Sequence, residues 1–117
     1  MSQSKDMKAA DRYFSLFIRD RDQQCTKCRK TDYLQCAHLI SRGYKSIRTD
    51  PRNAIALCRG CHLYFTHHPI EWEEWVNTHV GSTRLAELKK KALMHQRVDW
   101  KVERTNWREM CQRRDLL

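Results

Sequence analysis

The sequence has no long apolar segment, and it contains only three glycines and two prolines among its 117 residues. No run approaches the ~18 apolar residues that a membrane-spanning helix needs. The start, MSQSKDMKAADR, lacks the apolar region and the small-residue cleavage site of a secretory signal peptide. No internal repeat and no low-complexity linker is present. We therefore expect no membrane partner and a reducing, cytoplasmic setting.

The charge balance is strongly positive, with 23 Lys+Arg against 14 Asp+Glu and a formal net charge of +9. Cationic surfaces favour polyanionic partners, because each neutralised phosphate releases condensed counterions. A merely basic protein would have the same composition, so charge raises the question of nucleic-acid binding without settling it.

The length predicts one domain spanning residues 1–117. Within it we expect a core of about 14–80 and a basic helical C-terminal extension of about 82–117. A domain this small often needs a metal or disulfides to fix its loops.

Hydrophobic spacing predicts an α+β, mostly helical fold. Three- and four-residue spacings indicate an amphipathic helix over 6–22, and short segments at 33–40 and 53–57 indicate a hairpin. The polar, basic stretch 41–52 between them predicts a loop. Helices are then expected from His62 to about residue 67, over 70–79, and through 82–117.

Four of the six cysteines form two identical Cys-x-x-Cys knuckles, at Cys25/Cys28 and at Cys58/Cys61. Each knuckle can direct two thiolates at one ion, and two knuckles complete the tetrahedron that zinc prefers. A closed four-sulfur site leaves no position for substrate, so the expected Zn²⁺, one per chain, is structural. The alternatives are a redox pair or unconnected thiols, but no thioredoxin-like βαβ pattern surrounds either knuckle.

Three residues with chemical potential are interleaved with the knuckles: His38, Asn53 and His62. Taken singly, each has an ordinary interpretation, as a packed or solvated histidine or as a turn asparagine. Their joint order, and their attachment to two zinc knuckles, is much harder to obtain by chance.

These motifs carry a resemblance to a known family: Cys25-x-x-Cys28, Ala37-His38-Leu39-Ile40, Asn53-x-x-x-Leu57-Cys58-x-x-Cys61-His62, and Phe65. Over about residues 14–90 the chain resembles the HNH (ββα-metal, His-Me finger) endonucleases. Within that family it is most similar to the phage recombination nucleases of the NinG type. The resemblance implies a ββα-metal centre, one divalent ion (Mg²⁺ or Mn²⁺), and products with 5′ phosphate and 3′ hydroxyl ends. A phage-encoded protein would act in the bacterial host cytoplasm.

The chemistry of phosphodiester hydrolysis gives each residue a role. A neutral imidazole can remove a proton from water near pH 7, and His38 is the candidate for this general base. His62 is the candidate ligand for the divalent ion, which would offset charge on the scissile phosphate. Asn53 can hold the hairpin loop and thereby orient His38.

One position departs from the family pattern. Many members have an Asp or His directly before the general base as a second metal ligand, and here that position is Ala37. A ligand would then come from Gln35, His67 or His68, or the ion would keep more waters. Weak metal binding, or loss of catalysis, is the alternative.

Basic residues crowd the predicted loop near His38, namely Arg42, Lys45, Arg48 and Arg52. We expect them to contact DNA phosphates, although a solvated loop would have the same composition. No groove-reading motif is present, so cleavage is expected to have low sequence specificity or to follow DNA structure. The resemblance to the NinG type implies branched recombination intermediates as the substrate. In the C-terminal extension, ordinary helix-surface ion pairs explain the charges as well as DNA binding does.

The sequence therefore predicts a metal-dependent DNA endonuclease. The first alternative is a non-catalytic, zinc-stabilised nucleic-acid-binding module on the same scaffold, and the second is a redox protein using its Cys-x-x-Cys pairs. Any exposed members of the tryptophan set, Trp72, Trp75, Trp100 and Trp107, would mark the surface of a homodimer.

Overall fold

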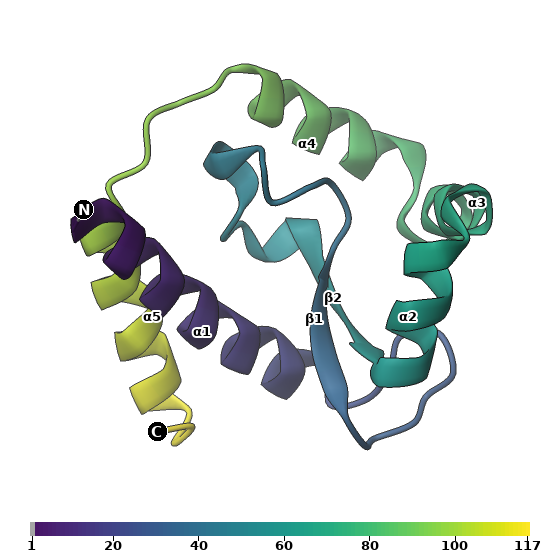
Figure 1. Ribbon diagram of the computed structural model, residues 1–117, viewed down its shortest axis with the longest axis horizontal. Helices are drawn as coiled ribbons and strands as arrows, with labels where there is room; N and C mark the ends of the chain where they lie inside the picture. The colour runs from purple at the N-terminus through teal and green to yellow at the C-terminus, as the bar shows by residue number, and fades with distance from the viewer. Residues whose placement is uncertain (1) are drawn as a thin grey trace.

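The computed structural model describes residues 2–117, which form five α-helices around one small antiparallel sheet (Figure 1). The helices are α1 (Ser2–Asp22), α2 (Arg59–His67), α3 (Pro69–Val80), α4 (Ser82–Leu93) and α5 (Trp100–Arg113). The strands are β1 (Leu34–His38) and β2 (Ala54–Cys58). The predicted α+β, mostly helical class is confirmed. None of these helices combines the length and the apolar composition needed to cross a bilayer.

The hairpin brings the two knuckles together. In its register Leu34 lies opposite Cys58 and His38 lies opposite Ala54, so the second knuckle begins where the first strand starts. The first knuckle reaches the same end because Thr26 binds the Ala56 carbonyl through both its N–H (2.9 Å) and its hydroxyl (2.8 Å). Helix α2 then starts directly after β2, so strand, strand and helix follow one another around the knuckles.

The segment predicted as an irregular loop, 41–52, is more ordered than expected. It contains two short 3₁₀ turns, η1 (Lys45–Ile47) and η2 (Pro51–Asn53). Asp50 caps the second turn by accepting a hydrogen bond from the Arg52 N–H at 2.9 Å. The buried side chain of Ile47 ties the first turn to the rest of the protein. The polar composition of this segment gave no sequence signal for the turns, because the single buried side chain of Ile47 is enough to anchor them.

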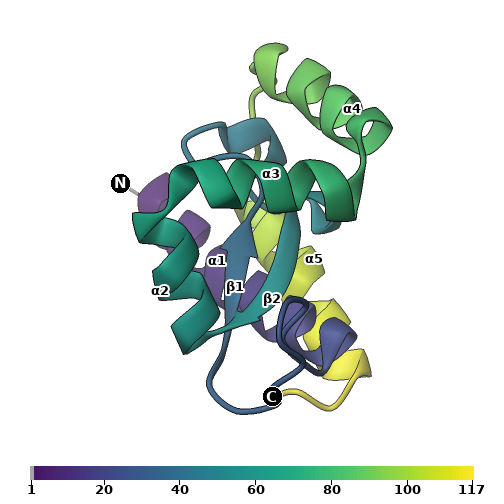
Figure 2. The same ribbon diagram turned by 90° about the vertical axis from the view of Figure 1, so that its right-hand side faces the viewer.

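Two hydrophobic clusters cover the hairpin. The larger one joins it to the helices that follow it, and its buried members include Leu39, Leu57, Phe65, Val76, Leu85 and Leu88. The smaller one joins it to α1 through Phe14, Ile18 and Ala54. Because both clusters contact it, β2 is buried along its whole length. Figure 2 shows the hairpin with α1 behind it and α3 crossing in front.

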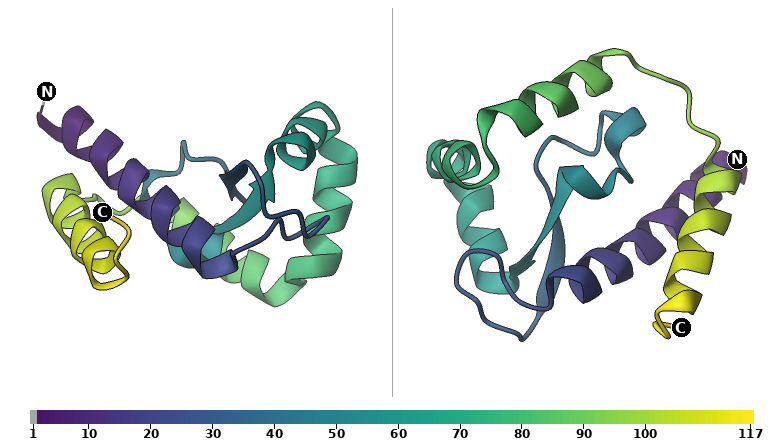
Figure 3. Two further views of the ribbon diagram at one scale, coloured as in Figure 1. Left: turned by 90° about the horizontal axis from the view of Figure 1, so that it is seen from below. Right: turned by 180° about the vertical axis from the view of Figure 1, so that it is seen from behind.

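The helical C-terminal extension consists of two helices, α4 and α5. Asp99 begins α5 by accepting from the N–H groups of Lys101 and Val102. Helix α5 then packs along α1, with the Trp107 ring edge-on to Phe14 at 5.1 Å between ring centroids. The first and last helices therefore lie side by side (Figures 1 and 3).

The tryptophans give no sign of a dimer surface. Trp100 is buried, and Trp72, Trp75 and Trp107 are half-buried against the two clusters. The proposed marker of a homodimer, an exposed tryptophan, is therefore absent from residues 2–117.

Candidate functional site

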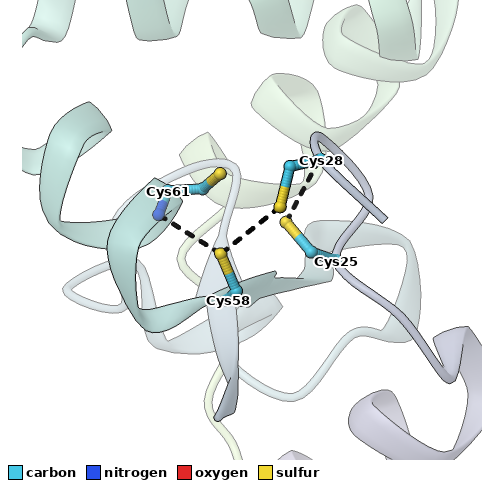
Figure 4. Close-up of side chains that lie close together, drawn as sticks. All are labelled: Cys25, Cys28, Cys58 and Cys61. Atoms are coloured by element: carbon cyan, nitrogen blue, oxygen red, sulfur yellow. Dashed lines mark hydrogen bonds between the residues drawn. The ribbon is translucent and has the colours of Figure 1, made fainter. Parts of the chain in front are cut away.

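The four knuckle cysteines form one compact cluster (Figure 4). The sulfurs of Cys25, Cys28, Cys58 and Cys61 all lie within 4.8 Å of one another. Four sulfurs at ~2.3 Å from a shared zinc ion would be separated by about 3.8 Å in a tetrahedron. The Sγ atoms of Cys28 and Cys58 are 3.5 Å apart, much longer than a disulfide bond. The spacing fits a metal ion such as zinc.

Backbone groups make the cluster suited to thiolates. The Cys28 N–H donates to Cys25 Sγ at 3.4 Å, and the Cys61 N–H donates to Cys58 Sγ at 3.4 Å. Cys58 also stands at the N-terminus of α2, where the helix dipole favours negative charge. Both knuckles therefore present sulfur in the same way.

The directions in which the thiol pKa values shift favour a cation at the cluster. Burial opposes ionisation of Cys25, but backbone hydrogen bonds from Cys28, Cys58 and Lys27 lower its pKa to about 6. Burial and the neighbouring sulfurs raise the pKa of Cys61. One sulfur therefore loses its proton readily, and the cluster then resists further ionisation. A divalent ion removes that resistance by compensating the thiolate charges.

A separate open cleft of about 1140 Å³ contains both candidate histidines. Its walls come from α1, β1, the segment after β1, and α2. His38 enters from the end of β1, and His62 enters from the first turns of α2. Two histidines that are 24 positions apart in the chain therefore face the same space, whereas Asn53 lies outside it, fully buried.

His38 is held in one orientation. Its Nε2 donates to the Arg48 carbonyl at 2.8 Å, because a carbonyl oxygen can only accept. In the neutral ring Nδ1 then keeps its lone pair, and this atom has no hydrogen-bond partner among residues 2–117. Burial lowers the pKa of His38, which outweighs the opposing effect of the hydrogen bond to Arg48. The side chain is thus a neutral base at pH 7.

Asn53 ends η2, directly before β2, and joins the two ends of the segment between the strands. Its Oδ1 accepts from the Ile40 N–H at 2.9 Å, and its Nδ2 donates to the Ile40 carbonyl at 3.0 Å. Nδ2 also donates to the Ile47 carbonyl at 3.2 Å. All of these contacts are to backbone, so Asn53 acts on the shape of the segment that carries Arg48.

His62 is oriented by Gln35. The imidazole Nδ1 lies 2.7 Å from Gln35 Oε1, and since an amide oxygen accepts, Nδ1 carries the proton. Nε2 of the neutral ring is then free to bind a cation. Burial lowers the pKa of His62, which also favours the neutral, metal-binding form.

The cleft offers few further ligands for a metal ion. Ala37 is buried between the hairpin and α2 and contributes none. Among residues 2–117 the only group of three or more His, Cys, Asp or Glu side chains arranged for a metal is the four-cysteine cluster. His67 lies five residues after His62, about 140° around the helix, and it does not line the cleft. Gln35 Oε1 is already bound to His62 Nδ1, so a second ion on His62 Nε2 would be completed mainly by water oxygens.

Only two of the four basic residues expected at the site lie in the cleft. Arg42 and Arg48 line the cleft, whereas Lys45 and Arg52 do not. Arg48 is committed to a bidentate pair with Asp11, with Nη2 2.7 Å from Oδ2. Arg42 is exposed, and its guanidinium has no hydrogen-bond or ion-pair partner within residues 2–117.

Helix α1 supplies a wall of the cleft that sequence reasoning missed. Asp11, Ser15 and Arg19 line it. Their spacing of four residues places them on one face of a helix, and this polar face was visible in the sequence. What was not visible is that the face turns towards His38, because that depends on how α1 packs against the hairpin.

Comparison of the chain with protein-family models, curated proteins and solved structures finds no match.

Proposed function

We propose that the protein is a metal-dependent DNA endonuclease of the HNH type, in which β1, β2 and α2 form the ββα-metal centre. The observation that carries this proposal is the meeting of His38 and His62 in one open cleft, each with one ring nitrogen fixed and the other free. A four-cysteine zinc site beside the cleft would stabilise the same three elements.

His38 acts as the general base in this proposal. Its Nδ1 accepts a proton from the water that attacks phosphorus, while Nε2 stays bound to the Arg48 carbonyl. The lowered pKa keeps the imidazole neutral, which is the state that a base needs. Asn53 positions this machinery by fixing the segment from Ile40 to Ile47.

His62 is the proposed ligand of the catalytic Mg²⁺ or Mn²⁺. When bound, the ion supplies charge neutralisation at the scissile phosphate. Mg²⁺ commonly binds through one or two protein groups, several waters and substrate phosphates, so a site with few protein ligands suits it. Gln35 holds His62 so that its Nε2 remains available to the ion.

The substrate class follows from the charge of the cleft. Arg42 and Arg19 are the cationic groups in the walls besides Arg48, whose charge is matched by Asp11. Phosphate contacts of this kind position DNA without reading bases, so the proposed cleavage has low sequence specificity or follows DNA structure.

Plasmid nicking tests the proposal. Zinc-loaded wild type should nick supercoiled DNA only with Mg²⁺ or Mn²⁺, and His38→Ala should lower the rate by at least ~100-fold. His67→Ala is the matched control, because this exposed histidine lies outside the cleft and should leave nicking unchanged. Equal activity of the His38→Ala and wild-type proteins would overturn the assignment of the base.

The second candidate is a non-catalytic, zinc-stabilised module that binds nucleic acid. The observation that favours it is Ala37, a buried side chain directly before His38 that cannot serve as a second metal ligand. This candidate predicts that zinc-loaded wild type binds DNA but does not nick it, even at millimolar Mn²⁺.

A further inference from the structure

A smaller pocket lies between the hairpin and the corner at which α2 meets α3 (Figure 2). Its volume is about 250 Å³, against about 1140 Å³ for the cleft. His38, His62 and Thr66 line both spaces, so the pocket adjoins the cleft at the two histidines of the proposed active site. A group that occupies the pocket therefore lies next to whatever the cleft holds.

The pocket differs from the cleft in its charge. None of the residues in 2–117 that line the pocket is Asp, Glu, Lys or Arg, whereas one carboxylate and three guanidinium groups line the cleft. Burial lowers the pKa of His38 and of His62, so the two shared imidazoles add no positive charge at pH 7. A phosphate therefore finds its counter-charges in the cleft, and the pocket suits an uncharged group.

The pocket has a buried apolar floor and an aromatic wall. Ala37, Leu57 and Phe65 line it and are at most 5% exposed. Trp72, the wall, is half-buried. Its ring is packed against Phe65 and Trp75, at 5.0 and 5.9 Å between ring centroids. A ring fixed in this way offers a flat surface on which a planar ligand can stack without rearrangement of the wall.

Ala37 keeps this pocket open. It lines the pocket and not the cleft, so its side chain faces the pocket side of β1. A longer side chain at this position would project into the space beside Leu57 and Trp72. The residue that departs from the family pattern therefore also provides room next to the two histidines.

We infer that this pocket receives the base of the nucleotide next to the scissile phosphate, turned out of the DNA stack, while the cleft holds the phosphate itself. The inference rests on the proposed function. A nucleotide joins an anionic phosphate to an uncharged planar base, and the two adjoining spaces separate charge in the same way. At about 250 Å³ the pocket lies below the ~300–1,000 Å³ of sites for drug-sized ligands, which suits a single base.

The state of the base decides how readily it enters. A base within a duplex must lose its pairing and stacking to reach the pocket, whereas an unpaired base has less to lose. Stacking on an aromatic side chain tolerates any base, because every base has a π-face. The protein should therefore prefer DNA with an unpaired base and should have little preference for its identity.

Three fluorescein-labelled duplexes of one sequence separate recognition of the base from flexibility of the DNA. The first is fully paired, the second has one extra unpaired thymine, and the third has an abasic tetrahydrofuran residue in place of that thymine. Dissociation constants are measured by fluorescence anisotropy at one KCl concentration between about 50 and 200 mM, without added divalent ion. Wild type should bind the thymine duplex ~10-fold more tightly than the abasic duplex. Equal binding of these two DNAs would mean that only flexibility matters and would overturn the inference.

A variant that fills the pocket should remove this preference. Ala37→Leu should reduce the ratio of thymine to abasic affinity to below ~2-fold, while its affinity for the paired duplex changes by less than ~2-fold. The matched control is Ala86→Leu, the same change at an exposed position of α4 outside both spaces, and it should keep the full ratio. A folded Ala37→Leu protein with the wild-type ratio would refute the pocket.

A second variant guards against misfolding, because a larger side chain at the buried Ala37 can overpack the core. Thr66→Leu narrows the pocket from an exposed position, and the Thr66 hydroxyl binds only the His62 carbonyl of its own helix, at 2.7 Å. This variant should keep wild-type zinc content and melting temperature and lower the thymine-to-abasic ratio by at least ~3-fold. The ratio cancels any effect on phosphate contacts, since Thr66 also lines the cleft. An unchanged ratio here would likewise count against the inference.

The assay involves no cleavage, so it separates the pocket from the proposed function. Zinc-loaded wild type that prefers the thymine duplex but never nicks DNA would refute the endonuclease and leave the pocket to a DNA-binding module. Nicking that depends on His38, together with equal binding of the thymine and abasic duplexes, would refute the pocket alone. No binding to any of the three duplexes would also overturn the pocket.

Discussion

Asn53 holds Ile40 by two hydrogen bonds, accepting from its N–H at 2.9 Å and donating to its carbonyl at 3.0 Å. Ile40 begins the segment that leads from His38 to Arg48, and Arg48 supplies the carbonyl bound by the imidazole. Because Asn53 is fully buried, water does not replace these bonds when the amide is removed. The orientation of His38 therefore depends on a residue that never faces the cleft.

Replacement of Asn53 should show this dependence. Asn53→Ala leaves the backbone groups of Ile40 and Ile47 without partners, so we expect a loss of ~2–4 kcal/mol in the free energy of unfolding. Asn77→Ala, at an exposed position of α3, should change it by less than ~0.5 kcal/mol. Urea denaturation measures both, and equal stability of the two variants would contradict the assigned role.

Loss of one knuckle cysteine should remove the metal. Cys28→Ser breaks the four-sulfur set, so we expect zinc content to fall from one per chain to below ~0.1 and the melting temperature to drop by more than ~10 °C. Cys36→Ser is the control, since Cys36 lies outside the cluster and burial raises its pKa to about 12, which keeps it a thiol. Zinc measured by mass spectrometry at full occupancy in Cys28→Ser would refute a four-cysteine site.

The parts of the site that are local in the chain were predictable from the sequence. Each knuckle is a four-residue pattern, and the hairpin between them follows from two short apolar segments, so the four-sulfur cluster could be expected. The helix, hairpin and helix order follows from the same periodicities.

Contacts set by packing were not predictable. Asp11 and Arg48 are 37 positions apart, and their pairing depends on the angle at which α1 crosses the hairpin. The same reason explains why the basic residues of this segment do not share one cleft. Arg48 and Arg52 are only four residues apart in the chain, yet Arg48 lines the cleft of His38 and Arg52 lines a different one. Sequence spacing does not encode such long-range geometry.

The acid limb of the pH–rate profile should lie below the ordinary histidine range. Protonation of Nδ1 removes the proposed base, and since the pKa of His38 is lowered, kcat/KM should stay level down to pH 6.5 and fall only below it. The pKa of His62 is also lowered, but a proton on its Nε2 competes with the metal ion for the same lone pair. A higher Mn²⁺ concentration should therefore shift the inflection due to His62 to lower pH and leave the inflection due to His38 in place. An inflection above pH 6.5 that is insensitive to Mn²⁺ would contradict the assignment.

Asp11 should tune this profile from α1. Its carboxylate raises the pKa of His38, so Asp11→Asn should move the inflection to lower pH. It also leaves the partly buried Arg48 without its bidentate partner, which should cost about 1–2 kcal/mol of stability. Asp32→Asn, an exposed change far from the cleft, should alter neither property. A purely structural role for Asp11 would lower stability and leave the inflection where it was.

The C-terminal helix should prove to be part of the folded unit. Trp107 packs its ring against Phe14 and Phe17, with 5.1 Å between centroids in both pairs, and α1 carries Asp11 to the cleft. Trp107→Ala should therefore lower the free energy of unfolding by ~2–4 kcal/mol. Nicking should fall as α1 loses its support, while zinc content should stay at one per chain because α5 packs mainly against α1.

The matched control for Trp107 is Leu93→Ala, since Leu93 is 66% exposed at the end of α4. That change should cost less than ~0.5 kcal/mol and leave nicking intact. If Trp107→Ala matched it in urea denaturation, α5 would be an appendage that contributes nothing to the fold. The wall of the cleft formed by α1 would then have to be held by the hairpin alone, through the small cluster around Phe14 and Ile18.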